Sequence, residues 1–83
     1  MSDSTAPLAD FSQERREHVL RWLVGEGVAT NLALSYEARI YAAVGALICD
    51  STGRFADADL KRALADPSIV QVARALLREA RNG

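Results

Sequence analysis

A calcium-binding loop is the first chemistry that this sequence suggests, because the stretch "DSTGRFADADLKRAL" at 50–64 places acids and hydroxyls around a glycine. An EF-hand loop needs oxygen ligands at its positions 1, 3 and 5, glycine at position 6 and a bidentate acid at position 12. With Gly53 at position 6, position 1 falls on Ile48, which offers no ligand atom, and position 12 holds the short side chain of Asp59. The pattern therefore predicts a turn between two helices and no metal site.

Catalytic chemistry would need a nucleophile beside a base, or paired acids, and the sequence offers neither pattern. His18 is the only histidine, and its neighbours Glu14 and Glu17 are typical of a solvated helix surface. Cys49 is the only cysteine and follows an apolar stretch, which favours core packing over a reactive thiol. We predict a protein that is not an enzyme and that has no catalytic residue, metal site or cofactor.

Two sets of residues could instead bind a partner. Arg74, Arg78 and Arg81 recur at helical spacing, so they form a strip on one side of the last helix. Trp22, the only tryptophan, falls at the edge of the apolar side of the first helix, and Arg15 lies about two turns before it on the same side. Tryptophan and arginine are enriched at the centres of protein interfaces, so these five residues are the predicted partner-binding residues.

Capping residues and glycines divide the chain into about four helices. The predicted starts are Asp10 or Ser12, Asn31 or Ser35, Asp57, and Asp66 followed by Pro67. Gly25 or Gly27 ends the first helix, and Phe55 is expected to enter the core between the second and third. Because 36–49 is apolar on nearly every side, we place this helix at the buried centre of a small, compact, all-α bundle.

Apolar residues at helical spacing on these four segments give the predicted core. They are Val19, Leu20, Leu23, Ile40, Val44, Leu47, Ile48, Leu60, Ala63, Leu64, Ile69, Val72, Ala73, Leu76, Leu77 and Ala80.

Length and composition fit one small domain. The 83 residues are 49% apolar and 25% charged, a balance typical of a globular protein. Residues 1–10 read as a flexible tail, and 11–83 as a single helical domain. The longest apolar run, 40–49, is much shorter than the roughly 20 residues that span a bilayer, and the tail does not resemble a secretion signal. These features predict a cytoplasmic protein with no membrane partner.

Parts of the second and last helices resemble acyl and peptidyl carrier proteins. The similar segments are "LSYEARIYAAV", "TGRF" and "DPSIVQVARALL", which cover about half of the chain. In that family a serine opens a recognition helix and carries phosphopantetheine, so the resemblance implies Ser35 as an attachment site. Leu34 stands where the family has aspartate, and the spacings to Gly53 and Pro67 are longer than in the family. A carrier-like domain is therefore kept as an alternative.

The function that the sequence favours is a small, non-catalytic domain that binds another protein. This description fits an adaptor, a regulatory subunit or an inhibitor of the kind that phages encode. All three act by binding another protein, and the sequence does not distinguish them. A second alternative is a helical regulator that binds nucleic acid. The net charge of −1 does not favour it, because nucleic-acid-binding domains are usually basic. The connection at 50–56 does not favour it either, because the turn of a helix-turn-helix has only about 3–4 residues. The oligomeric state is left open.

Overall fold

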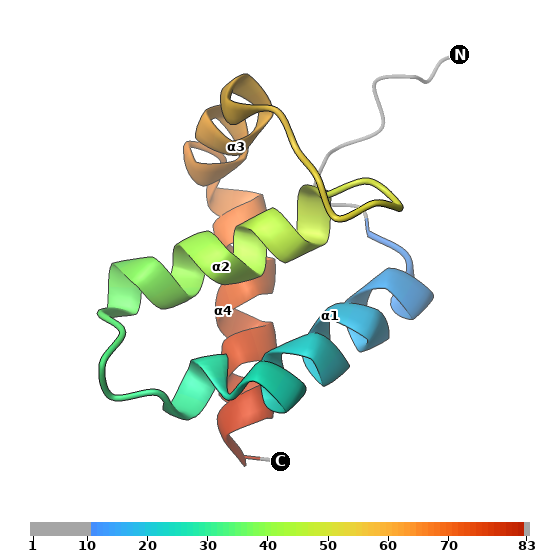
Figure 1. The fold of residues 1–83 in the computed structure, drawn as a ribbon. Coiled ribbons are helices and arrows are strands. Elements are labelled where there is room, and N and C mark those ends of the chain that lie inside the picture. The colour runs from blue at the N-terminus through green and yellow to red at the C-terminus, as the bar shows by residue number, and fades with distance from the viewer. Residues whose placement is uncertain (1–10, 83) are drawn as a thin grey trace.

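A computed structural model describes residues 11–82, and the predicted flexible tail, residues 1–10, lies outside this range. The described chain forms four α-helices and one short 3₁₀ helix, and it contains no strand (Figure 1). The elements are α1 (Gln13–Glu26), η2 (Val28–Thr30), α2 (Tyr36–Ile48), α3 (Asp57–Leu64) and α4 (Pro67–Asn82). The predicted all-α bundle of four helices is confirmed.

Local capping chemistry sets the ends of α1. The Ser12 Oγ accepts a hydrogen bond from the Arg15 N–H at 3.0 Å and so satisfies one of the free donors of the first turn. At the other end Gly27 has a φ of 66°, a left-handed conformation that costs glycine little free energy. The Gly27 N–H donates hydrogen bonds to the carbonyl oxygens of Leu23 and Val24. Of the alternatives that the sequence left open, Ser12 and Gly27 are the residues used.

Ser35 caps α2, since its Oγ accepts a hydrogen bond from the Ala38 N–H at 3.1 Å. The connection before it contains η2 and a turn in which Asn31 Oδ1 accepts from the Ala33 N–H at 2.9 Å. The predicted start at Ser35 is therefore confirmed, and Asn31 belongs to the preceding turn. The helix ends at Ile48, one residue earlier than predicted, with Cys49 as its C-cap.

The two remaining helices are joined by only Ala65 and Asp66. Asp66 Oδ1 accepts from the Ser68 N–H at 2.9 Å, so Asp66 caps α4 and Pro67 occupies its first position, as predicted. The prediction for α3 is wrong in one respect: Asp57 is its first helical residue, and the preceding Ala56 makes no side-chain cap. Asp57 and Asp59 still stabilise this end, because acids in a first turn interact favourably with the helix dipole.

The helices are arranged with α1 and α2 on one side and α4 crossing them on the other (Figure 1). In Figure 1, α1 and α2 lie in front, α4 crosses behind both at a steep angle, and α3 packs at one end. α2 contacts α1, η2, α3 and α4, and α4 in turn contacts every other element. The central position predicted for 36–49 is thus shared between α2 and α4.

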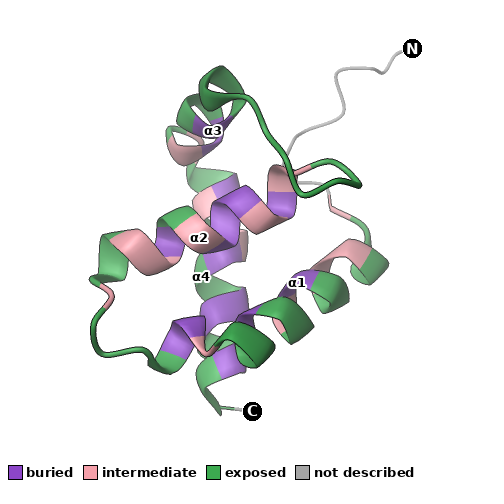
Figure 2. Ribbon diagram, in the orientation of Figure 1, coloured by how far each residue is buried: buried purple, intermediate pink, exposed green. Residues whose placement is uncertain are grey.

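The core lies where these helices cross (Figure 2). α2 buries Ile40, Ala43, Val44, Gly45 and Leu47, but Tyr36 and Tyr41 are about half exposed, so one side of its first turns faces solvent. The largest side chains with less than 2% exposure are Leu23, Leu47, Ile69, Val19 and Val44. Most of the predicted core is buried; Leu20, Ile48, Leu64 and Val72 are only partly buried at its edge.

Candidate functional site

The loop between α2 and α3 is held by the carboxylate of Asp50. Its Oδ1 accepts hydrogen bonds from the Thr52 hydroxyl at 2.6 Å, the Thr52 N–H at 2.8 Å and the Arg54 N–H at 3.1 Å. Gly53 adopts φ of 81°, which completes the turn. The carboxylate that opens the EF-hand-like stretch therefore takes part in closing a turn, and the predicted turn at Gly53 is present.

These hydrogen bonds lower the pKa of Asp50 below its ordinary value; the Thr52 hydroxyl has the largest effect, followed by the N–H groups of Arg54 and Thr52. A lowered pKa means that the ionised carboxylate stabilises the fold above the ordinary aspartate range, and that this stabilisation is lost as the pH falls through the lowered pKa. We expect wild type to be more stable than Asp50→Asn at neutral pH, and the difference to shrink below about pH 4. Thermal melts over a pH series measure it, and a difference independent of pH would contradict it.

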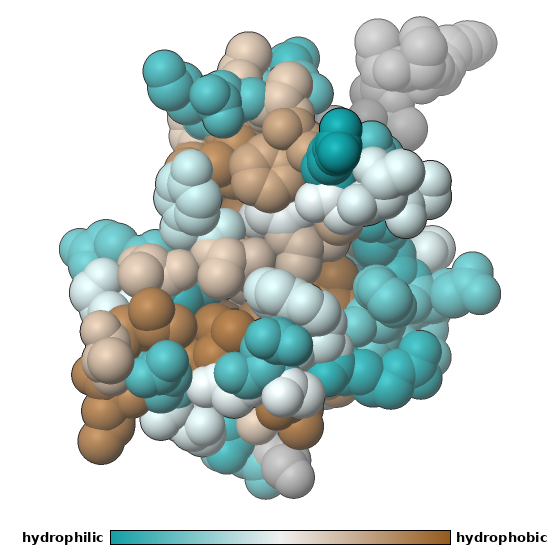
Figure 3. Space-filling model, in the orientation of Figure 1, coloured by the Kyte–Doolittle hydropathy of each residue, from teal (hydrophilic) through white to brown (hydrophobic). Residues whose placement is uncertain are grey.

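An apolar groove lies between α1, α2 and this loop, and we call it the aromatic groove. Its floor is made of the small residues Ala42, Gly45 and Ala46, and Trp22 and Phe55 line it from α1 and from the loop. It encloses about 250 Å³. Figure 3 shows this part of the surface, over α2 and toward the loop before α3, in neutral to apolar colours.

Phe55 does not enter the core as predicted, because it is 39% exposed. Its ring lies on the outer surface of α2 over Gly45, and a Cβ atom at Gly45 would come within 3.0 Å of the ring. The missing side chain at Gly45 therefore leaves room for the ring beside the helix. Trp22 is 40% exposed and shares the groove with Phe55, as its predicted place at the edge of the apolar side requires.

Arg15 closes the C-terminal end of α2. Its Nη1 donates hydrogen bonds to the carbonyl oxygens of Cys49 at 2.9 Å and Leu47 at 3.4 Å. A guanidinium at this end satisfies free carbonyls and complements the negative end of the helix dipole.

The Cys49 Sγ donates to the Ala46 carbonyl at 3.3 Å, and Cys49 is partly buried, at the end of the helix and outside the buried core.

A second concave surface brings together four arginines, and we call it the arginine hollow. Arg39 contributes from α2, and Arg74, Arg78 and Arg81 contribute from α4. Tyr36, Ala29 and Leu77 complete the lining, which contains no acidic residue, and the hollow encloses about 220 Å³. Among the described residues the one ion pair is Arg62–Asp59 on α3, so none of the four arginines is neutralised by a salt bridge.

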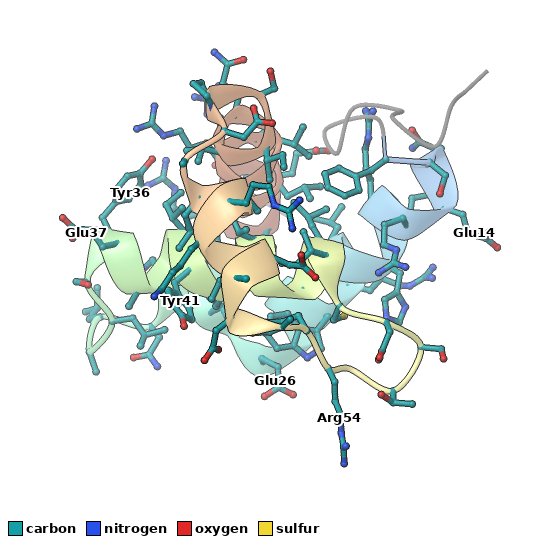
Figure 4. All side chains as sticks on the ribbon, turned by 90° about the horizontal axis from the view of Figure 1, so that it is seen from above. Glu14, Glu26, Tyr36, Glu37, Tyr41 and Arg54 are labelled. Atoms are coloured by element: carbon teal, nitrogen blue, oxygen red, sulfur yellow. The ribbon has the colours of Figure 1, made fainter. Side chains whose placement is uncertain are left out.

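Two of these arginines are held in place by contacts within the chain. The Arg74 guanidinium lies over the ring of Tyr36, 5.8 Å from its centroid, within the range of a cation–π interaction. Figure 4 shows Tyr36 at the N-terminal end of α2, pointing to the side on which α4 lies. Arg39 Nη2 donates to the Asn31 carbonyl at 2.8 Å, whereas its Nε is buried and has no hydrogen-bond partner among the described residues.

A shallow apolar hollow continues from the arginine hollow and shares Tyr36 and Arg74 with it. Its other lining residues are Glu37, Ile40, Tyr41, Leu64 and Val70, from α2, α3 and α4. The two hollows together form one surface that is cationic at one end and aromatic to aliphatic at the other.

The structure thus brings together three of the five predicted partner-binding residues, Arg74, Arg78 and Arg81, and separates them from Trp22 and Arg15. The aromatic groove and the arginine hollow have no lining residue in common. Sequence reasoning did not select Tyr36 and Arg39, although their spacing of three places them on one side of a helix. What it could not supply was the crossing of α2 over α4 that sets this side beside the arginine strip.

Ser35, the attachment site that a carrier-like domain would require, is exposed and serves as the cap of α2. This cap accounts for the serine without any modification. In residues 11–82 no helix combines the length and apolar character needed to cross a membrane.

Comparisons with known protein families, with curated proteins and with solved structures find no match to this chain.

Proposed function

We propose that this protein is a small, non-catalytic domain that binds an acidic segment of another protein in the arginine hollow. The observation that carries the proposal is the convergence of four arginines from α2 and α4 on one concave surface that contains no acidic side chain. Complementary charge attracts and orients a partner, and it disfavours partners of the wrong sign. The role in the cell, as an adaptor, a regulatory subunit or a phage-type inhibitor, would be carried out in the cytoplasm.

The composition of the combined surface also supports protein binding. Arginine and tyrosine are enriched at protein interfaces, and both are present here next to aliphatic side chains. Arg74 and Tyr36 lie at the junction of the two hollows and restrain each other, so less side-chain entropy is lost when a partner binds. A partner segment with acids beside an apolar side chain would match both halves of this surface.

Reversing two charges of the hollow should remove binding. In Arg74→Glu/Arg78→Glu we expect the affinity for peptides selected by wild type from a random displayed library to fall by about 100-fold, or about 2.7 kcal/mol. The selected peptides should be rich in Asp and Glu. Fluorescence anisotropy of the synthesised peptides measures the affinities.

Arg21→Glu/Arg54→Glu is the matched control, because it makes the same change in net charge at two exposed positions outside the hollow. Figure 4 shows Arg54 projecting away from the body of the protein. Equal loss of binding in both double variants would mean that only net charge matters, and would refute a specific site. Tighter binding of duplex DNA than of any peptide would favour the nucleic-acid alternative instead.

The carrier-like alternative has a separate test. Incubation with a phosphopantetheinyl transferase and coenzyme A, followed by intact-mass measurement, should give no mass gain if Ser35 serves only as a helix cap. A gain that disappears in Ser35→Ala would establish the carrier function and would displace the proposal above.

A further inference from the structure

The arginine hollow concentrates more positive charge than one carboxylate can neutralise. Four arginines and no acidic residue line a space of about 220 Å³, and Glu37 lines the neighbouring shallow hollow and not this one. Like charges held close together repel one another, and a bound anion relieves that repulsion. The hollow is therefore suited to a compact anion that carries more than one negative charge.

Arg39 adds its charge to the hollow and is held in place by the turn before α2. Its Nη2 is committed to the Asn31 carbonyl, while its buried Nε–H has no acceptor within the described chain. Arg74 is already restrained over Tyr36, so the hollow is partly organised before anything binds.

Guanidinium chemistry favours phosphate as that anion. Each guanidinium presents N–H donors in a planar fork that pairs with two oxygens of a carboxylate or a phosphate. A phosphate monoester carries about −1.5 to −2 charges and three strong acceptor oxygens, so one group can engage several forks at once, whereas a carboxylate has two oxygens and one charge. We propose that the arginine hollow binds the phosphate group of a phosphorylated side chain on the partner protein. This inference rests on the proposed function, because it specifies which acidic segment the hollow selects.

A phosphoprotein fits the hollow better than a nucleic acid backbone does. A nucleic acid duplex presents a long row of phosphates, so a protein that binds it needs basic residues spread along one face. Here the cations converge from α2 and α4 on one hollow, and the apolar shallow hollow adjoins it at Tyr36 and Arg74. A phosphorylated side chain flanked by apolar residues occupies both.

The test compares five sets of probes on the full chain by titration followed with ¹⁵N NMR, including the arginine Nε–H signals. Three are peptide libraries with matched randomised flanks, which differ only in the central residue: phosphoserine or phosphotyrosine in the first, glutamate in the second and the unmodified residue in the third. The fourth probe is inorganic phosphate alone, and the fifth is a 12-base-pair DNA duplex. We expect the phosphorylated library to bind at least tenfold more tightly than the glutamate library and than inorganic phosphate. Arg74→Gln/Arg78→Gln should lose at least tenfold in that affinity, and Arg21→Gln/Arg54→Gln should lose none.

The outcomes separate this inference from the proposed function. Equal binding of the phosphorylated and glutamate libraries overturns the inference and leaves an acidic-segment site intact. Equal binding of the phosphorylated library and inorganic phosphate also overturns it, since the hollow would then be a free-anion site only. Binding of none of the libraries, or tighter binding of a 12-base-pair duplex, overturns both. Thermal melts of each variant identify any loss caused by unfolding, and Arg81→Gln at the solvent-exposed end of α4 then replaces the double variant.

Discussion

Val44→Asp is expected to abolish stable folding. Val44 is fully buried on α2, where this helix contacts its neighbours, and no buried polar or charged residue is found among residues 11–82. An aspartate at this position would bury a carboxylate with no partner, which costs several kcal/mol whether it stays charged or takes up a proton. A chain of this length is stable by only about 4–12 kcal/mol, so the penalty is comparable with the whole free energy of unfolding. Circular dichroism melts and sedimentation measure the loss.

Tyr41→Asp is the matched control for this prediction. It introduces the same side chain into the same helix, three residues earlier, at a position that is 51% exposed. We expect this variant to stay soluble and to melt cooperatively with a loss of about 1 kcal/mol or less. A Val44→Asp protein that also melts cooperatively would mean that the packing around α2 is loose.

The helices and most of the core are predictable from the sequence because they depend on nearby residues. Ser12 and Ser35 cap helices through hydrogen bonds to N–H groups three residues later, and Gly27 ends α1 through its own left-handed conformation. Pro67 is compatible with only the first turn of a helix. Each of these signals is complete within about four residues, so the fold around it does not change what it means.

Apart from shifts of one residue at the start of α3 and the end of α2, the errors arise where distant segments meet. Phe55 is apolar and follows a turn, which predicts burial, yet its place depends on Gly45 ten residues away. Arg15 is read from the sequence as a surface residue, but its guanidinium bonds carbonyls more than 30 positions later. Arg39 and Tyr36 join the arginine strip for the same reason, because the crossing of α2 and α4 is set by the packing of the whole core. Spacing on one helix predicts a strip, and only tertiary packing makes it a hollow.

Leu23→Ala is expected to cost about 2–5 kcal/mol of the free energy of unfolding, because it removes a fully buried side chain and leaves a cavity that its neighbours fill incompletely. Its neighbour Trp22 has a larger side chain but is 40% exposed at the rim of the aromatic groove. We expect Trp22→Ala to cost less than about 2 kcal/mol, because part of the indole already contacts water and the small residues of the groove floor remain packed below it. Chemical denaturation of both variants gives the two values.

This pair decides what Trp22 does. A loss in Trp22→Ala as large as that in Leu23→Ala would make the indole a packing residue and would leave the arginine hollow as the surface for a partner. A small loss, together with indole emission that is shifted to the red and quenched by iodide, would show that the groove is open in the free protein. Trp22 is then available to a partner, since a half-exposed aromatic ring beside Phe55 gains free energy when a second apolar surface covers it. Leu23, on the inner face of α1, would then contribute to stability, and Trp22, on its outer face, would offer a partner a second contact surface in addition to the arginine hollow.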